Sequence, residues 1–120
     1  MNKQVYQGSC HCQAIQFELR CEPIENALQC NCSICHRKNA VMSKQTFDQQ
    51  EFTLIQGKEQ LSVYQWGDQD VNHYFCQRCG IYPFHNTAEQ PDNYRINLLC
   101  IDGLPIQAID ITHFDGKHLL

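Results

Sequence analysis

Short runs of alternating apolar and polar residues cover most of the chain, and turn residues separate them. Ile15, Phe17 and Leu19 alternate with polar neighbours over residues 14–19, which predicts a half-buried strand. Glycine at the end of one later run predicts a hairpin turn across residues 57–60. Further strands are predicted over residues 27–30, 52–56, 61–66, 71–75, 94–101 and 106–111.

Helical periodicity is almost absent from the chain. Residues 36–40 are predicted to form one helical turn, and Pro83 confines residues 81–85 to a sheet edge or a turn. Many short strands with almost no helix are typical of a mainly antiparallel β fold. A length of 120 residues without repeats or low-complexity linkers predicts one domain, residues 1–120.

Nine cysteines are too many for an ordinary cytosolic core, and an odd number excludes complete internal disulfide pairing. The first residues contain no apolar stretch of the signal-peptide type. We therefore expect a cytoplasmic protein, whose clustered cysteines bind metal ions in preference to forming disulfides. The clusters are Cys10-His11-Cys12, Cys30-Asn31-Cys32-Ser33-Ile34-Cys35 and Cys76-Gln77-Arg78-Cys79.

The charge balance argues against one class of partner. The net charge is −4 at pH 7, whereas a nucleic-acid surface needs a basic stripe that displaces phosphate counterions. No apolar run is long enough to span a bilayer. We therefore expect neither a nucleic-acid nor a membrane partner.

Cys10, Cys12, Cys76 and Cys79 are predicted to form a closed zinc site. Cys76 and Cys79 have the spacing of a zinc knuckle, in which backbone N–H groups point at the sulfurs and Gly80 can adopt a positive φ. Cys10 and Cys12 are two residues apart, so on a strand they face the same way. Four thiolates leave no coordination position free, which is typical of structural zinc. The alternative is that Cys10 and Cys12 are ordinary buried cysteines.

Cys30, Cys32 and Cys35 are predicted to form an open zinc site. A metal held by three protein ligands keeps one position for water or substrate, which is the pattern of catalytic zinc. Arg37 and Lys38 follow after His36. They could balance the excess negative charge, bind a substrate carboxylate or form a solvated basic turn.

Other interpretations of the central cluster stay open. Cys32 and Cys35 could form a redox disulfide, and thiolates accept iron as well as zinc. A histidine could also fill the fourth position and close the site. The candidates are His36, His73, His85 and His113.

Five residues outside the clusters allow both a structural and a functional role. Cys21 is expected to be a bystander, and Cys100 follows an apolar run that predicts a small core residue. Thr46, Phe47 and Trp66 could line a pocket, although aromatic residues at strand spacing are more typical of a core.

The three clusters and their flanking residues resemble the glutathione-dependent formaldehyde-activating enzyme family, also called the centromere protein V domain family. The resemblance rests on residues 8–12, 30–35, 75–80, 97–100 and 114–116. It implies an Mss4-like fold of small coiled antiparallel sheets around zinc. It also implies structural zinc ligands at Cys10, Cys12, Cys76 and Cys79, and catalytic zinc ligands at Cys30, Cys32 and Cys35.

Two positions depart from the family pattern. Gln13 stands where glycine is common, and His36 stands where a basic residue is usual. Neither departure removes a ligand.

The resemblance further implies a carbon–sulfur lyase, because the family's reaction joins formaldehyde and glutathione into S-hydroxymethylglutathione. Our first hypothesis is therefore a zinc-dependent enzyme with two Zn²⁺ ions and a small thiol partner such as glutathione. Arg37 or Lys38 would anchor a substrate carboxylate. The second hypothesis is a non-catalytic zinc scaffold that binds a protein partner.

Overall fold

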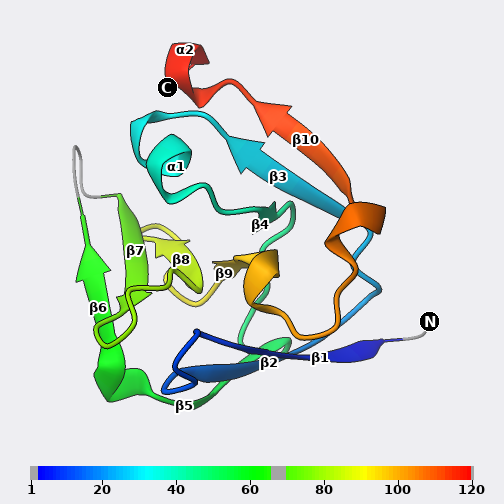
Figure 1. The fold of residues 1–120 in the computed structure, drawn as a ribbon, viewed down its shortest axis with the longest axis vertical. Helices are drawn as coiled ribbons and strands as arrows, with labels where there is room; N and C mark the ends of the chain where they lie inside the picture. The colour runs from blue at the N-terminus through cyan, green and yellow to red at the C-terminus, as the bar shows by residue number, and fades with distance from the viewer. Residues whose placement is uncertain (1–2, 66–69, 120) are drawn as a thin grey trace.

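The computed structural model describes residues 3–65 and 70–119, which form three small β-sheets and short helices (Figure 1). The chain order is β1 (Gln4–Ser9), β2 (Gln16–Cys21), β3 (Asn26–Cys30), α1 (Ser33–Lys38), β4 (Met42–Ser43), β5 (Phe52–Gln56), η1 (Lys58–Gln60), β6 (Leu61–Tyr64), β7 (Val71–Cys76), β8 (Phe84–Thr87), β9 (Tyr94–Ile96), η2 (Leu98–Cys100), η3 (Ile106–Ala108), β10 (Asp110–Phe114) and α2 (Gly116–Leu119), where η marks a 3₁₀ turn.

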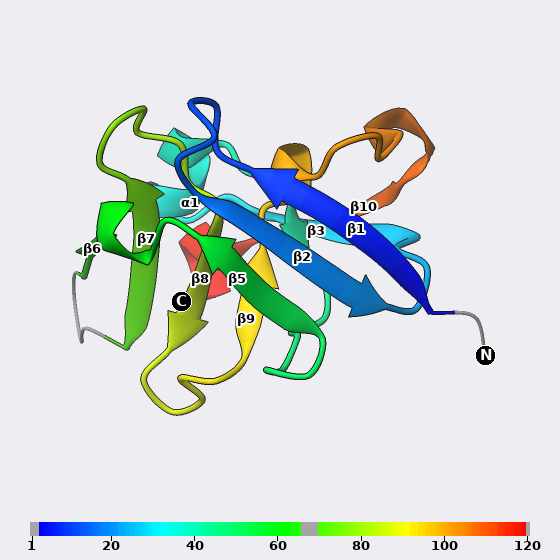
Figure 2. The same cartoon turned by 90° about the horizontal axis from the view of Figure 1, so that it is seen from below.

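The first sheet has the strand order β1-β2-β5 and is antiparallel throughout (Figure 2). Phe17 and Leu19 of β2 are fully buried, which confirms the predicted alternation. The strand itself begins at Gln16, later than expected, although Ile15 before it is also buried. The alternation therefore identified the face that β2 turns toward the core.

The predicted hairpin between residues 52–56 and 61–66 does not form. β5 pairs with β2, whereas β6 pairs with β7 in the antiparallel sheet β6-β7-β8-β9. Gly57 has a φ of 96° and leads into the 3₁₀ turn η1, which carries the chain from one sheet to another. The end of the predicted strand, and the pocket role considered for Trp66, lie outside the described residues.

The third sheet has the order β10-β3-β4, and it contains a parallel pair within the mainly antiparallel fold that the sequence predicts. β10 runs parallel to β3, from the partners Asp110 and Asn26 to the partners Phe114 and Cys30. The parallel pairing brings the C-terminal segment beside the central cysteine cluster.

Two predicted strands begin or end elsewhere. β9 stops at Ile96 because Asn97 caps the 3₁₀ turn η2, its side chain accepting the Leu99 N–H at 3.2 Å. Residues 106–108 form the 3₁₀ turn η3 before β10. The predicted helical turn is found, but α1 starts at Ser33 and ends where Asn39 takes a φ of 50°.

An aromatic cluster occupies the centre of the molecule, where the sheets meet. The Phe52 ring centroid lies 5.8 Å from that of Phe17, 5.1 Å from that of Phe84 and 4.6 Å from that of Tyr94. Isolated bridges connect the segments around it, pairing Gly8 with Ile101, Met42 with Asn97 and Phe47 with Tyr94. Cys21, Cys100 and Phe47 are also buried in this core, as expected for Cys100 and for the core interpretation of Phe47.

Candidate metal centres and the cavity beside them

The sulfurs of Cys10, Cys12, Cys76 and Cys79 come together as the sequence predicts. All four lie within 4.8 Å of one another, and the Cys12 sulfur is 3.6 Å from both the Cys10 and the Cys76 sulfurs. A tetrahedral zinc ion with Zn–S bonds of about 2.3 Å separates its sulfurs by about 3.8 Å. The spacing of this four-cysteine cluster therefore fits such an ion.

Backbone N–H groups stabilise the thiolate form of this cluster. The Ile15 N–H donates to the Cys10 sulfur and the Arg78 N–H donates to the Cys76 sulfur, each at 3.4 Å. Burial raises the pKa of Cys79, but N–H groups of Cys12 and Ile81 and the neighbouring thiols outweigh it and lower that pKa to about 6. Burial raises the pKa of Cys10 in the same cluster to about 11. Zinc binds sulfur as thiolate, and the spacing of the four sulfurs suits this metal.

Cys30, Cys32 and Cys35 form a three-cysteine cluster whose sulfurs also lie within 4.8 Å of one another. Cys30 ends β3, Cys32 precedes α1 and Cys35 lies within that helix. Burial raises the pKa of Cys32, but N–H groups of Cys35 and Ile34 and the two neighbouring thiols outweigh it, so the net pKa is lowered. All nine cysteines are free thiols, including the Cys32–Cys35 pair considered for a disulfide.

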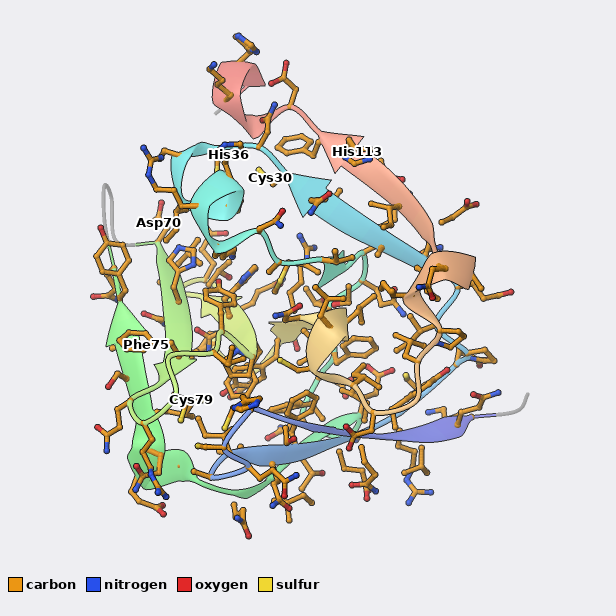
Figure 3. All side chains as sticks on the ribbon, viewed as in Figure 1. Cys30, His36, Asp70, Phe75, Cys79 and His113 are labelled. Atoms are coloured by element: carbon orange, nitrogen blue, oxygen red, sulfur yellow. The ribbon has the colours of Figure 1, made fainter. Side chains whose placement is uncertain are left out.

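Within the described part of the chain, no histidine nitrogen joins either cysteine cluster at that distance. His36 and His113 lie beside a smaller cavity of about 260 Å³ and are exposed (Figure 3). His73 and His85 instead line a larger cavity on which the three-cysteine cluster opens. The geometry thus favours the open site over one closed by histidine.

The larger cavity has a volume of about 760 Å³, which is typical of a small-molecule site. One part of its wall is apolar and comes from β3, α1, β4, β7 and β10. These residues are Leu28, Ile34, Met42, Val71 and Phe114. The polar and charged part comes from Ser33, Lys38, Asp70, His73, His85, Arg95 and Lys117, so one carboxylate lies among the cations.

Comparison with known proteins identifies the family of the chain. The sequence profile described as glutathione-dependent formaldehyde-activating enzyme matches residues 5–114. The chain belongs to this family. A crystal structure of a Rhodobacter sphaeroides protein, a structural genomics target, is 31% identical in sequence with a TM-score of 0.72, and the match covers 88% of this chain and 99% of that one. The mainly β, Mss4-like fold implied by the resemblance is confirmed.

The glycine that the family resemblance leads us to expect at position 13 would suit the local backbone. Gln13 adopts a φ of 66° and donates its N–H to the Cys10 carbonyl at 3.1 Å, closing the turn that holds Cys10 and Cys12. Gly80 has a φ of 78° in the equivalent turn after Cys76, as predicted. A non-glycine residue in this conformation costs about 1–2 kcal/mol, so the turn is retained in this member at some expense in stability.

The two basic residues after the central cluster have different environments in this family member. Arg37 is exposed and donates to the Ser33 carbonyl of its own helix at 2.9 Å. Lys38 lines the larger cavity, and its ammonium group lies 3.7 Å from the centroid of the Tyr82 ring. The Lys38 Nζ and the Arg95 Nε are buried without a hydrogen-bond partner within the described residues. Burial lowers the pKa of both groups.

Sequence reasoning missed Arg95, whose only signal is one cation within the apolar strand β9. It also missed the role of the segment after β10. The Asn31 side chain donates to Asp115 at 3.0 Å and accepts the Lys117 N–H at 2.9 Å. This C-terminal segment therefore holds the loop between Cys30 and Cys32 in place. Residues 114–116 of the segment are among those on which the family resemblance rests.

Strand β7 connects the two candidate metal centres. Val71 and His73 near its start line the larger cavity, and Cys76 at its end belongs to the four-cysteine cluster. Figure 3 shows Asp70 near α1 and Cys79 at the far end of the strand. The helices of the described residues are all too short to cross a membrane.

Proposed function

We propose that the chain binds two zinc ions, and that the three-cysteine cluster and its cavity catalyse addition of a small thiol, such as glutathione, to formaldehyde. The proposal is carried by one observation: a group of three sulfurs borders a cavity of about 760 Å³ that is also lined by Lys38 and Arg95, each of which has one buried nitrogen without a hydrogen-bond partner among the described residues. When zinc is bound there, its charge favours the thiolate form of a thiol substrate. The four-cysteine cluster would hold the second, structural ion.

The cavity residues would bind and orient the thiol substrate. Lys38 and Arg95 each place a buried, unpartnered N–H group at this cavity, and a substrate carboxylate would satisfy both. The apolar wall would exclude water around the reacting carbon. Family membership supports glutathione and formaldehyde as the substrates. The product is S-hydroxymethylglutathione, and the reverse reaction is a carbon–sulfur elimination.

Replacing Cys32 tests the assigned role of the three-cysteine cluster. We expect the wild type to consume glutathione faster than the spontaneous reaction when formaldehyde is present, and Cys32→Ser to fall to the spontaneous rate. Metal analysis should find two zinc ions per wild-type chain and one per variant chain. Cys21→Ala is the control, because Cys21 is buried away from both clusters. Equal rates for wild type and Cys32→Ser would rule out the proposed mechanism.

Replacing Lys38 tests the carboxylate subsite. A hydrogen bond to a charged group contributes about 1.5–3 kcal/mol, so Lys38→Met is expected to raise the KM for glutathione about tenfold or more. Arg37→Met removes the neighbouring exposed charge and should leave KM within twofold. Steady-state kinetics at fixed formaldehyde measures both. A KM that rises equally in the two variants would indicate a general charge effect instead of a subsite.

A further inference from the structure

A tyrosine hydroxyl connects two histidines beside the three-cysteine cluster. The Tyr82 hydroxyl lies 2.6 Å from Nδ1 of His73 and 2.8 Å from Nδ1 of His85. His73 on β7 and His85 on β8 are partners across the two strands, with ring centroids 5.8 Å apart. Both imidazoles line the larger cavity.

The two histidines cannot be the same tautomer. Burial, with the Lys38 ammonium as the next cause, lowers the pKa of His73 to about 4 and that of His85 to about 3, so both rings are neutral at pH 7. Burial also raises the pKa of Tyr82, which keeps its hydroxyl protonated. That hydroxyl has one proton and can donate to only one Nδ1. The other histidine must therefore carry its own proton on Nδ1 and donate it to the tyrosine oxygen.

This arrangement fixes whether Nε2 of each ring carries a proton. The histidine that donates from Nδ1 has an unprotonated Nε2, which is a base. The histidine that accepts at Nδ1 has a protonated Nε2, which is an acid. Within the described residues, neither Nε2 has a hydrogen-bond partner, so both remain free for a molecule in the cavity.

We propose that His73, Tyr82 and His85 form a proton relay, which removes the proton of the thiol and supplies the proton of the new hydroxyl group. This inference rests on the proposed function. The basic Nε2 takes the thiol proton as the sulfur–carbon bond forms and the carbonyl π bond of formaldehyde breaks. The acidic Nε2 gives its proton to the resulting oxygen. Tyr82 then passes its hydroxyl proton to the histidine that lost one, and receives the Nδ1 proton of the histidine that gained one.

The relay balances without any further reactant. One proton leaves the thiol and one reaches the hydroxymethyl oxygen, and all three side chains end neutral. The two histidines have exchanged tautomers, which is the arrangement that the reverse elimination needs. Exchange with water in the cavity restores the starting pair for another addition.

Nitrogen-15 NMR of the imidazoles at pH 7 tests the tautomers without requiring activity. We expect one ring protonated on Nδ1 and the other on Nε2, with His73→Gln and His85→Gln variants assigning the signals. Two rings with the same tautomer in the wild type would overturn the relay.

Kinetics of Tyr82→Phe tests the role in catalysis, because the phenyl ring keeps the packing and removes the hydroxyl. We expect kcat to fall about 100-fold, within the usual range for general acid–base catalysis, and KM to change less than threefold. The wild-type solvent isotope effect should show more than one proton in transfer, and that signature should disappear in the variant. Tyr64→Phe is the matched control, since Tyr64 lies beside His73 with ring centroids 6.5 Å apart and is 52% exposed.

The two proposals fail in different ways. An active wild type with an equally active, folded and zinc-loaded Tyr82→Phe variant would overturn the relay and leave the proposed function intact. A wild type no faster than the spontaneous reaction would overturn the proposed function and, with it, the catalytic role of the relay.

Discussion

Cys76→Ser is expected to leave the domain unfolded at room temperature, and a strong chelator is expected to unfold the wild type. Cys76 ends β7 and Cys79 lies in the turn after it, whereas Cys10 and Cys12 follow β1, so the four-cysteine cluster joins two separate sheets. Structural zinc contributes on the order of 10 kcal/mol to small domains, and the total stability of a domain is only about 5–15 kcal/mol. Loss of this ion would therefore remove most or all of the stability.

Circular-dichroism melts and zinc counts on the same samples measure this effect. Cys21→Ala is the matched control, because Cys21 is also a buried cysteine but lies outside both clusters. It should remain folded with its zinc content unchanged. An unaltered melting curve for protein that has lost all its metal would show that the sheets hold together without the ion.

Gly57→Ala is expected to destabilise the metal-loaded protein by about 3 kcal/mol or more. Gly57 has a φ of 96°, and an added Cβ would lie 2.2 Å from the Ala14 carbonyl oxygen and 2.7 Å from the Ile15 Cα. Both neighbours are backbone atoms of the chain leading into β2, so they cannot rotate away as a side chain could. The substitution would force β2 away from the turn that leads from β5 to β6.

Gly103→Ala separates the steric clash from the conformational cost. Gly103 has a φ of 74°, but nothing lies within 4 Å of an added Cβ. That variant should lose only about 1 kcal/mol, the usual cost of a left-handed conformation for alanine. Urea unfolding at a fixed free-zinc concentration compares the two. Equal losses at positions 57 and 103 would show that β2 tolerates the displacement.

The cysteine clusters were predictable because their ligands are close in the sequence. Cys30, Cys32 and Cys35 lie within six residues, and a strand end followed by one helical turn is sufficient to bring their sulfurs together. Pairing the first cluster with the third required only the chemical preference of zinc for four ligands. The backbone conformation of Gly80 was also predictable, because Gly80 has the positive φ that its position after the knuckle predicts.

The sheet pairing was not predictable from local patterns. Alternation shows which side of a strand is buried, but it contains no information about the neighbouring strand. Residues 52–56 and 61–66 looked like a hairpin, yet Gly57 and the turn after it send β6 to a different sheet. The parallel pairing of β10 with β3 joins segments more than 80 residues apart, as the partners Asp110 and Asn26 illustrate.

The sequence by itself determined the two cysteine clusters that could hold metal ions, the mainly β character and the family, because these depend on residue types at short, regular spacings. Only the tertiary structure decided that Lys38 faces the cavity while Arg37 faces solvent, that Arg95 joins it, and that Tyr82 connects His73 to His85. These groups come from different strands and from a helix, and their positions depend on how three sheets pack around one core. Such packing depends on the whole chain, so it cannot be predicted from local sequence patterns.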